Sequence, residues 1–105
     1  LTDPGVEYFR GKNVVITGGS RGLGLVMARQ LADAGARLAV CARDDAELGR
    51  AFDDLAARGG RVVAVECDVT DESAARTAVD AAADALGGID NLVYSPAISP
   101  LVALV

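Results

Sequence analysis

A glycine-rich segment near the N-terminus holds the residue types best suited to chemistry. Residues 17–24 read Thr-Gly-Gly-Ser-Arg-Gly-Leu-Gly and follow the apolar run 14–16. Glycines let a chain turn sharply and let a phosphate approach the backbone, and a helix that begins there aims its N-terminal amides at that phosphate. The segment therefore predicts a pyrophosphate-binding loop, with an ordinary Gly-rich turn as the alternative. A P-loop is excluded because Gly-Lys-Ser and Gly-Lys-Thr are absent.

Several other kinds of chemistry lack the residues they need. The 105 residues contain 10 Lys and Arg, 15 Asp and Glu and no His, for a net charge of −5. Without His and with only two Cys, we expect no metal site and no Ser-His-Asp or Cys-His nucleophile. An acidic chain with scattered arginines predicts no nucleic-acid partner.

Composition also sets expectations about location. No apolar run reaches the roughly 18 residues of a membrane helix, and no signal peptide is recognised at the N-terminus. Cys41 and Cys67 suit free, buried thiols rather than a disulfide scaffold. These features predict a cytoplasmic protein with no membrane partner.

The glycine loop needs elements that position it, and the chain alternates between two kinds. Short β-rich runs are expected over residues 13–17, 37–41, 61–67 and 89–94. Their apolar stretches are continuous rather than alternating, which is typical of parallel strands covered on both faces. Residues 1–11 are interpreted as a short lead-in.

Three amphipathic helices are predicted between these strands. Asp44 is expected to cap the second, with Glu47 at capping-box spacing, and Thr70 or Asp71 to cap the third. The first is expected to bury Leu23, Val26, Met27, Leu31 and Ala34, the second Leu48, Phe52 and Leu55, and the third Ala75, Ala78, Val79, Ala82 and Leu86.

Alternating strands and helices with short loops predict right-handed crossovers in one α/β domain over residues 1–105. We expect a three-layer αβα, Rossmann-like fold with a parallel sheet in the order 3-2-1-4. The ligand crevice would then lie between the first and fourth strands.

Three motifs resemble those of the short-chain dehydrogenase/reductase family. They are Thr-Gly-x-x-x-Gly-x-Gly over residues 17–24, Asp68-Val69 after the third strand, and Asn91-Leu92-Val93 in the fourth. The resemblance covers residues 10–100, which is half or less of such a protein. It implies NAD(P) binding, with Asp68 near the adenine. The cofactor-binding residues expected on this basis are Gly18, Ser20, Arg21, Gly22, Leu23, Gly24, Arg43, Asp68, Val69, Ser95 and Ala97.

The end of the second strand bears on cofactor choice. A carboxylate there would hold the adenosine ribose hydroxyls, but Ala42 and Arg43 occupy these positions. A guanidinium can clamp a 2′-phosphate, and Arg21 and Ser20 can reach the same group. NADP(H) is therefore predicted over NAD(H), the alternative being that both arginines are ordinary surface charges.

The chain departs from the family pattern in two places. Residues 94–97 read Tyr-Ser-Pro-Ala where the family has Asn-Asn-Ala-Gly, which alters the cofactor pocket. The family's catalytic Tyr-x-x-x-Lys is absent after the fourth strand. Tyr8 and Lys12 have this spacing but precede the first strand, so no catalytic residue is predicted in this chain.

The resemblance implies an NADP(H)-dependent oxidoreductase that transfers a hydride to or from a small carbonyl or alcohol substrate. This chain would supply the dinucleotide-binding portion, and a homo-oligomer is compatible with the family. A non-catalytic nucleotide-binding or structural half-domain is the alternative. A Rossmann-type methyltransferase is disfavoured because it would need an acidic residue where Ala42-Arg43 stands.

Overall fold

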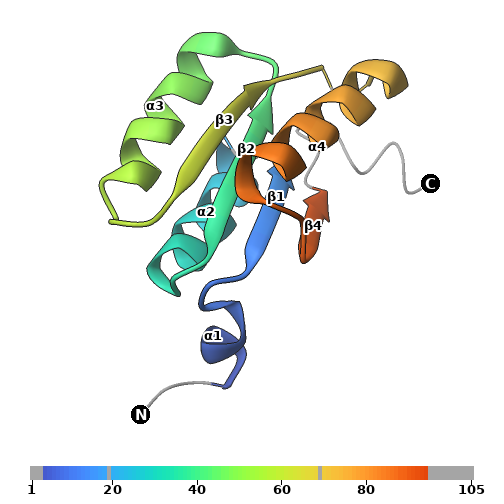
Figure 1. Cartoon of the computed structure of the whole chain (residues 1–105). Helices are drawn as coiled ribbons and strands as arrows, with labels where there is room; N and C mark the ends of the chain where they lie inside the picture. The colour runs from blue at the N-terminus through green and yellow to red at the C-terminus, as the bar shows by residue number, and fades with distance from the viewer. Residues whose placement is uncertain (1–3, 19, 69, 95–105) are drawn as a thin grey trace, which may run out of the picture.

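One parallel sheet in the order β3-β2-β1-β4 organises the chain, which confirms the predicted α/β architecture (Figure 1). The computed structural model describes residues 4–18, 20–68 and 70–94. The strands are β1 (Asn13–Thr17), β2 (Arg37–Ala42), β3 (Val62–Glu66) and β4 (Asn91–Tyr94). β1 pairs with β2 from Asn13–Arg37 to Thr17–Cys41, and Thr17 also pairs with Tyr94 of β4.

The helices are α1 (Pro4–Phe9), α2 (Gly22–Asp33), α3 (Asp45–Ala56) and α4 (Glu72–Leu86). α2 and α3 cover one face of the sheet and α4 covers the other (Figure 1). The lead-in before β1 contains a short helix, Pro4–Phe9, that was not predicted. Proline suits the first position of a helix, where its missing amide would have no intrahelical partner.

The strands bury alternate side chains in two separate cores. Val14, Ile16, Leu38 and Val40 pack toward α2 and α3. Val15, Ala39 and Cys41 face α4. Both sides of the central strands are therefore buried, which explains why their sequences read as continuous apolar runs.

The predicted inner face of α2 was wrong at two positions. Leu23 is 70% exposed and Val26 is 44% exposed. The buried residues are instead Gly24, Ala28 and Ala32. Small residues at a spacing of four let the helix backbone approach the sheet closely. Because these small residues face the sheet, the side chains of Leu23 and Val26 point away from it.

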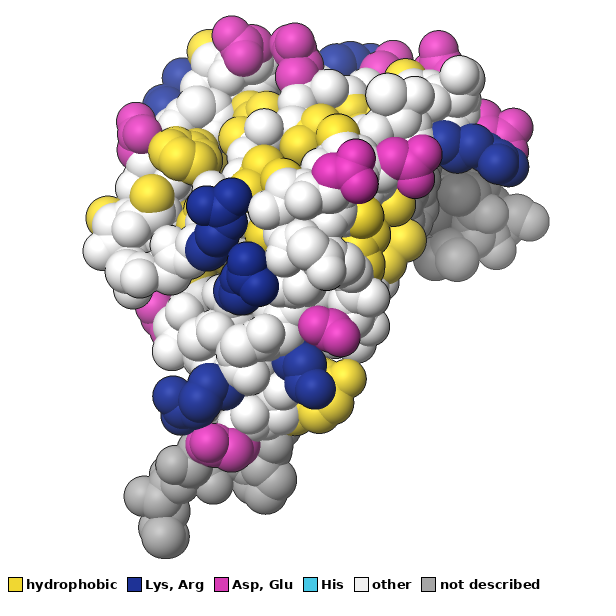
Figure 2. Space-filling model, viewed as in Figure 1, with side chains coloured by type: hydrophobic (Ala, Val, Ile, Leu, Met, Phe, Trp, Pro, Cys, Tyr) yellow, Lys and Arg dark blue, Asp and Glu magenta, His cyan; other side chains and the backbone are white. Residues whose placement is uncertain are grey.

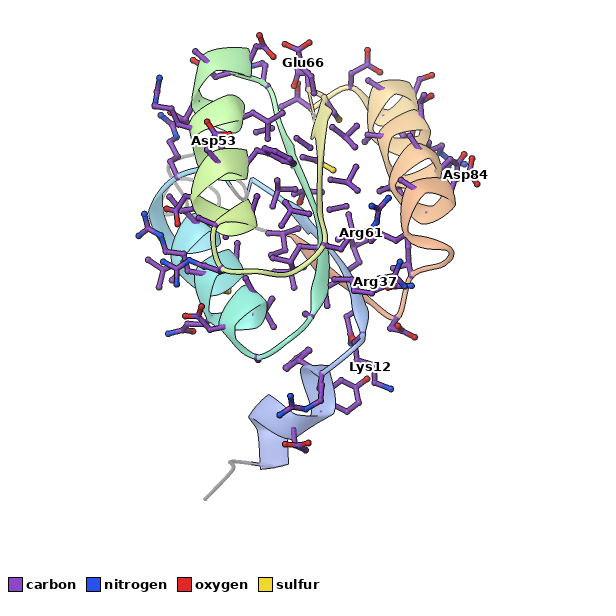
Figure 3. All side chains as sticks on the ribbon, turned by 60° about the vertical axis from the view of Figure 1, so that its left-hand side comes forward. Lys12, Arg37, Asp53, Arg61, Glu66 and Asp84 are labelled. Carbon is purple, nitrogen blue, oxygen red and sulfur yellow. The ribbon has the colours of Figure 1, made fainter. Side chains whose placement is uncertain are left out.

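The predicted core-facing side of α4 is largely confirmed. Ala78, Ala82 and Leu86 are buried and Ala75 is partly buried. Gly87 ends the helix in the left-handed conformation, with φ of 86°. Arg61 donates to the Ala85 carbonyl at 3.2 Å, so a basic side chain from the start of β3 meets the last turn of α4 (Figure 3).

Ion pairs join α2 to α3. Asp54 of α3 accepts from Arg29 of α2 at 2.6 and 2.9 Å and from Arg58 at 3.2 Å. Arg58 in turn donates to Asp33, at the end of α2, at 2.8 and 3.0 Å. The Arg29 and Arg58 guanidinium groups hold the pKa of the Asp54 carboxyl below its usual value.

A shallow hollow of about 640 Å³ lies between α3 and β3. Hydrophobic side chains are exposed along this edge of the sheet, between α3 and α4 (Figure 2). The residues that line the hollow include the buried Leu48 and the partly exposed Phe52 and Val62, and none of the predicted cofactor residues lines it. Within the described ranges, no helix has the length and apolar character needed to cross a bilayer.

Candidate functional site

The glycine loop leaves the sheet at the carboxyl end of β1, between β2 and β4. The chain runs from β1 through α2 to β2 on one side and from β3 through α4 to β4 on the other. The connections thus diverge at the boundary between β1 and β4. In α/β proteins, ligands bind outside the carboxyl ends of the strands where connections diverge in this way.

The loop backbone adopts conformations that favour glycine. Gly18 has φ of 77°, and its amide donates to the Cys41 carbonyl at 2.8 Å. Gly22 has φ of 55°, and a Cβ there would meet no atom within 4 Å. Glycine at position 22 therefore meets a backbone requirement and leaves open space above the loop. Gly24 is buried in the first turn of α2.

The N-terminus of α2 has no side-chain cap. Arg21 is the N-cap residue, with extended backbone (φ −161°), and its side chain makes no capping hydrogen bond. The first amides of a helix lack intrahelical acceptors, so an uncapped start presents donors to an anion. Gly22, Leu23 and Gly24 provide these amides, and the exposed Leu23 side chain lies outside the core.

Ser20 and Arg21 meet a carboxylate that the sequence reasoning did not assign to the site. Ser20 is 7% exposed, and its Oγ donates to Glu47 Oε1 at 2.7 Å. The Arg21 Nε lies 3.7 Å from the same oxygen. Glu47 belongs to the first turn of α3, so this contact ties the loop to the next helix.

The signal for Glu47 was present in the sequence but was interpreted as a capping box. Half of that box exists, because Asp44 caps α3 by accepting from the Glu47 amide at 2.9 Å. The Glu47 carboxylate, however, turns to Ser20. The pairing of β1 with β2 brings the glycine loop within hydrogen-bonding reach of the Glu47 carboxylate, and the sequence alone does not show this.

Arg43 follows β2 at the same edge of the sheet. Its Nη1 lies 3.9 Å from Asp68 Oδ2, and the Arg43 side chain is 77% exposed. Ala42 ends β2, and Arg43 lies in the adjacent loop, as predicted.

Asp68 shapes the turn that precedes α4. Its Oδ1 accepts from the Thr70 amide at 3.0 Å and from the Thr70 hydroxyl at 2.6 Å. These hydrogen bonds, together with Arg43, lower the pKa of the Asp68 carboxyl. Asp71 rather than Thr70 caps α4, accepting from the Ala74 amide at 3.1 Å. Contact of Asp68 with adenine stays a prediction.

Cys41 and Cys67 are buried free thiols in one core cluster under this edge. Burial raises the pKa of Cys41 to about 11, with a smaller contribution from Cys67. Burial also raises the pKa of Cys67, as do the nearby Asp68 and Asp71. Both thiols are therefore poor nucleophiles at neutral pH. Among the described side chains, no cluster of His, Cys, Asp or Glu could hold a metal ion.

The structure brings most of the predicted cofactor residues to one edge, and three lie outside the described residues. Gly18, Ser20, Arg21, Gly22, Leu23, Gly24, Arg43 and Asp68 follow the carboxyl ends of β1, β2 and β3. Val69, Ser95 and Ala97 are not described. Lys12 Nζ lies 4.9 Å from the centre of the Tyr8 ring, before β1 and at the opposite end of the sheet (Figure 3).

Comparisons with known proteins agree with this geometry. The family model for short chain dehydrogenases matches residues 12–104. L-rhamnose 1-dehydrogenase (NAD(P)(+)) of Azotobacter vinelandii is 38% identical over 94 residues, covering 85% of this chain and 36% of that protein. The chain spans about a third of the length of the curated relatives it matches.

Solved structures show the same fold. A short chain dehydrogenase from Mycobacterium smegmatis superposes with a TM-score of 0.83 at 32% identity, over 88% of this chain and 39% of that one. A short chain dehydrogenase/reductase from Burkholderia phymatum in complex with NAD gives a TM-score of 0.76 at 36% identity. That match covers 80% of this chain and 30% of the other.

Proposed function

Because the chain belongs to the short-chain dehydrogenase family, we propose that it forms the dinucleotide-binding part of an NADP(H)-dependent oxidoreductase. The reaction is hydride transfer between the cofactor and a carbonyl or alcohol carbon. The nicotinamide supplies the hydride chemistry when it is bound, and the protein supplies binding and orientation.

The described residues fit a pyrophosphate. The uncapped N-terminus of α2 offers backbone donors, and Gly18 and Gly22 keep side chains away from the approach. Two positively charged groups, Arg21 and Arg43, lie at the same sheet edge. The single observation that carries the proposal is this uncapped helix start directly after β1.

The preference for NADP(H) rests on the residues that follow β2. Ala42 ends the strand, so this position offers no carboxylate to hold the ribose hydroxyls or to repel a 2′-phosphate. The side chains of Arg43 and Arg21 are 77% and 62% exposed, so a phosphate can reach both. A guanidinium pairs with phosphate through two parallel hydrogen bonds.

Replacing Arg43 tests this preference. We expect Arg43→Ala to weaken NADPH binding about ten- to a hundredfold, the equivalent of a charge-assisted hydrogen bond, and to leave NADH nearly unchanged. Dissociation constants from fluorescence or calorimetric titration measure both. Arg50→Ala, which removes an exposed arginine from α3, serves as the charge-matched control. Equal losses for both cofactors would refute the 2′-phosphate role.

The oxidoreductase activity itself is tested on the full-length protein. No Tyr-x-x-x-Lys follows β4 in residues 1–105, so we place the proton donor outside this chain. Hydride transfer from NADPH to a panel of ketones and aldehydes, followed by absorbance, is the measurement. Tight NADPH binding without turnover on any of them would favour a non-catalytic nucleotide-binding protein.

A further inference from the structure

The Glu47 carboxylate occupies an unexpected place in the proposed cofactor site. It accepts the Ser20 hydroxyl hydrogen bond at 2.7 Å and lies 3.7 Å from the Arg21 guanidinium. The Glu47 side chain is 23% exposed, and the Ser20 residue is 7% exposed. A partly buried, hydrogen-bonded carboxylate is screened less by solvent than an exposed ion pair. Its charge therefore acts strongly on whatever binds beside Arg21.

Glu47 is not needed to cap its own helix. Asp44 already accepts from the Glu47 amide at 2.9 Å, and Asp45 adds another acidic residue to the first turn of α3. The carboxylate of Glu47 is thus available for the loop, and the described structure shows it engaged with two groups that we expect to meet a phosphate. Arg43 is likewise paired with a carboxylate, that of Asp68, at 3.9 Å.

We propose that Glu47 is a specificity-determining residue that limits the preference for NADP(H) over NAD(H). This inference rests on the proposed function. The 2′-phosphate must compete with the Glu47 carboxylate for the Ser20 hydroxyl and the Arg21 guanidinium. NAD(H) carries no such phosphate, so it can bind while the Ser20–Glu47–Arg21 contacts stay intact.

Electrostatics gives the direction of the effect. A phosphate that reaches Arg21 comes close to a carboxylate of the same sign, and this repulsion opposes the attraction of both arginines. Discrimination between two ligands depends on such repulsive elements as much as on attractive ones. Neutralising Glu47 removes the repulsion and frees Arg21, and it changes nothing that an unphosphorylated ribose needs.

Glu47→Gln is the sharpest variant because an amide oxygen can still accept from the Ser20 hydroxyl. We expect NADPH to bind the full-length Glu47→Gln protein about two- to fivefold more tightly than the wild type, the size of effect a partly exposed charge pair produces. NADH affinity should stay within about twofold. Glu47→Ala should move NADPH affinity in the same direction.

Asp53→Asn provides the matched control. Asp53 lies on the same helix, two turns further on and exposed (Figure 3), and it contacts neither Ser20 nor Arg21. Losing its charge should leave the ratio of the two dissociation constants unchanged. Thermal melting of each variant confirms that the compared proteins are folded.

The outcomes separate this inference from the proposed function. An unchanged or weakened NADPH affinity in both Glu47 variants would overturn the role of Glu47. If the wild type still prefers NADPH and Arg43→Ala removes that preference, the proposed function stands without it. A wild-type protein that binds neither dinucleotide would overturn both.

Discussion

The start of α2 differs from the starts of α3 and α4. Asp44 caps α3 and Asp71 caps α4, each accepting a hydrogen bond from an amide three residues later. Arg21 stands at the corresponding position of α2 and makes no such bond. The two Asp-capped helices satisfy their own amides, whereas α2 leaves its amides for another partner. Among α2, α3 and α4, only the start of α2 has no side-chain cap, which agrees with the pyrophosphate site that we propose there.

The missing cap carries a cost that packing must offset. An Asp N-cap contributes about 1 kcal/mol to stability, which α2 forgoes. Its buried face, Gly24, Ala28 and Ala32, and the pairing of Arg29 with Asp54 hold the helix in place instead. The start of α2 thus lacks the stability that a side-chain cap would add, and its first amides, shortly after β1, have no side-chain acceptor.

Blocking the loop should have the largest effect. We expect Gly18→Val to abolish binding of both NADPH and NADH, because a β-branched residue strains a backbone with φ of 77° and so distorts the loop that we propose holds the pyrophosphate. Stability should fall by about 1–3 kcal/mol. Titration with each dinucleotide and urea unfolding measure the two effects.

Gly59→Val is the control for strain alone. Gly59 lies far from the glycine loop. It has φ of 94°, and a Cβ there would meet nothing within 4 Å. It should lose comparable stability and keep dinucleotide binding. Normal titration curves for Gly18→Val would show that the loop is an ordinary turn.

Converting α2 into an Asp-capped helix should have the next largest effect. Arg21→Asp places a carboxylate where it can accept the first amides of α2, in competition with the pyrophosphate. We expect both dinucleotides to bind at least about tenfold more weakly, in line with the loss of charge-assisted hydrogen bonds. Arg21→Ala, which adds no cap, should weaken NADPH more than NADH. Wild-type affinity for NADH in Arg21→Asp would contradict the assignment of these amides.

Removing a cap from α4 should have the smallest effect and should not change binding. Asp71→Ala leaves the Ala74 amide without its side-chain acceptor, at a cost of about 1 kcal/mol. Urea midpoints of wild type and variant measure the loss, and NADPH affinity should stay within about twofold of the wild type. Asp71→Asn, which retains an acceptor, should restore most of the stability. A large loss of binding would show that the start of α4 also belongs to the site.

The sequence was sufficient for the topology and for the Asp44 cap, and it left Thr70 and Asp71 as alternatives at the start of α4. Continuous apolar runs indicated a doubly covered parallel sheet, and Asp44 carried a capping-box spacing, whereas only the structure identifies Asp71 as the cap of α4. The inner face of α2 was predicted wrongly at Leu23 and Val26, because hydrophobicity favoured these residues over the small ones that are buried. Which residues lie inward there depends on how closely the helix approaches the sheet, and periodicity does not report that distance.

The site was predicted in part for the same reason. Glycine spacing and the arginine after β2 pointed to the loop and to Arg43. The Ser20–Glu47 hydrogen bond joins residues 27 positions apart, and it forms because pairing of β1 with β2 brings the glycine loop to the first turn of α3. Such a contact is a property of the fold and has no short-range pattern.

The stripe of Gly24, Ala28 and Ala32 has a consequence for evolution and engineering. The 12-residue helix α2 is about 18 Å long, and its first turn forms part of the glycine-rich segment. Ala28 is completely buried, so a larger side chain there would push α2 away from the sheet and shift its N-terminus. A substitution in the middle of the core would then alter the proposed phosphate site more than a conservative change at its rim. Packing at Ala28 therefore determines where the first turn of α2 lies, and that turn belongs to the proposed ligand site.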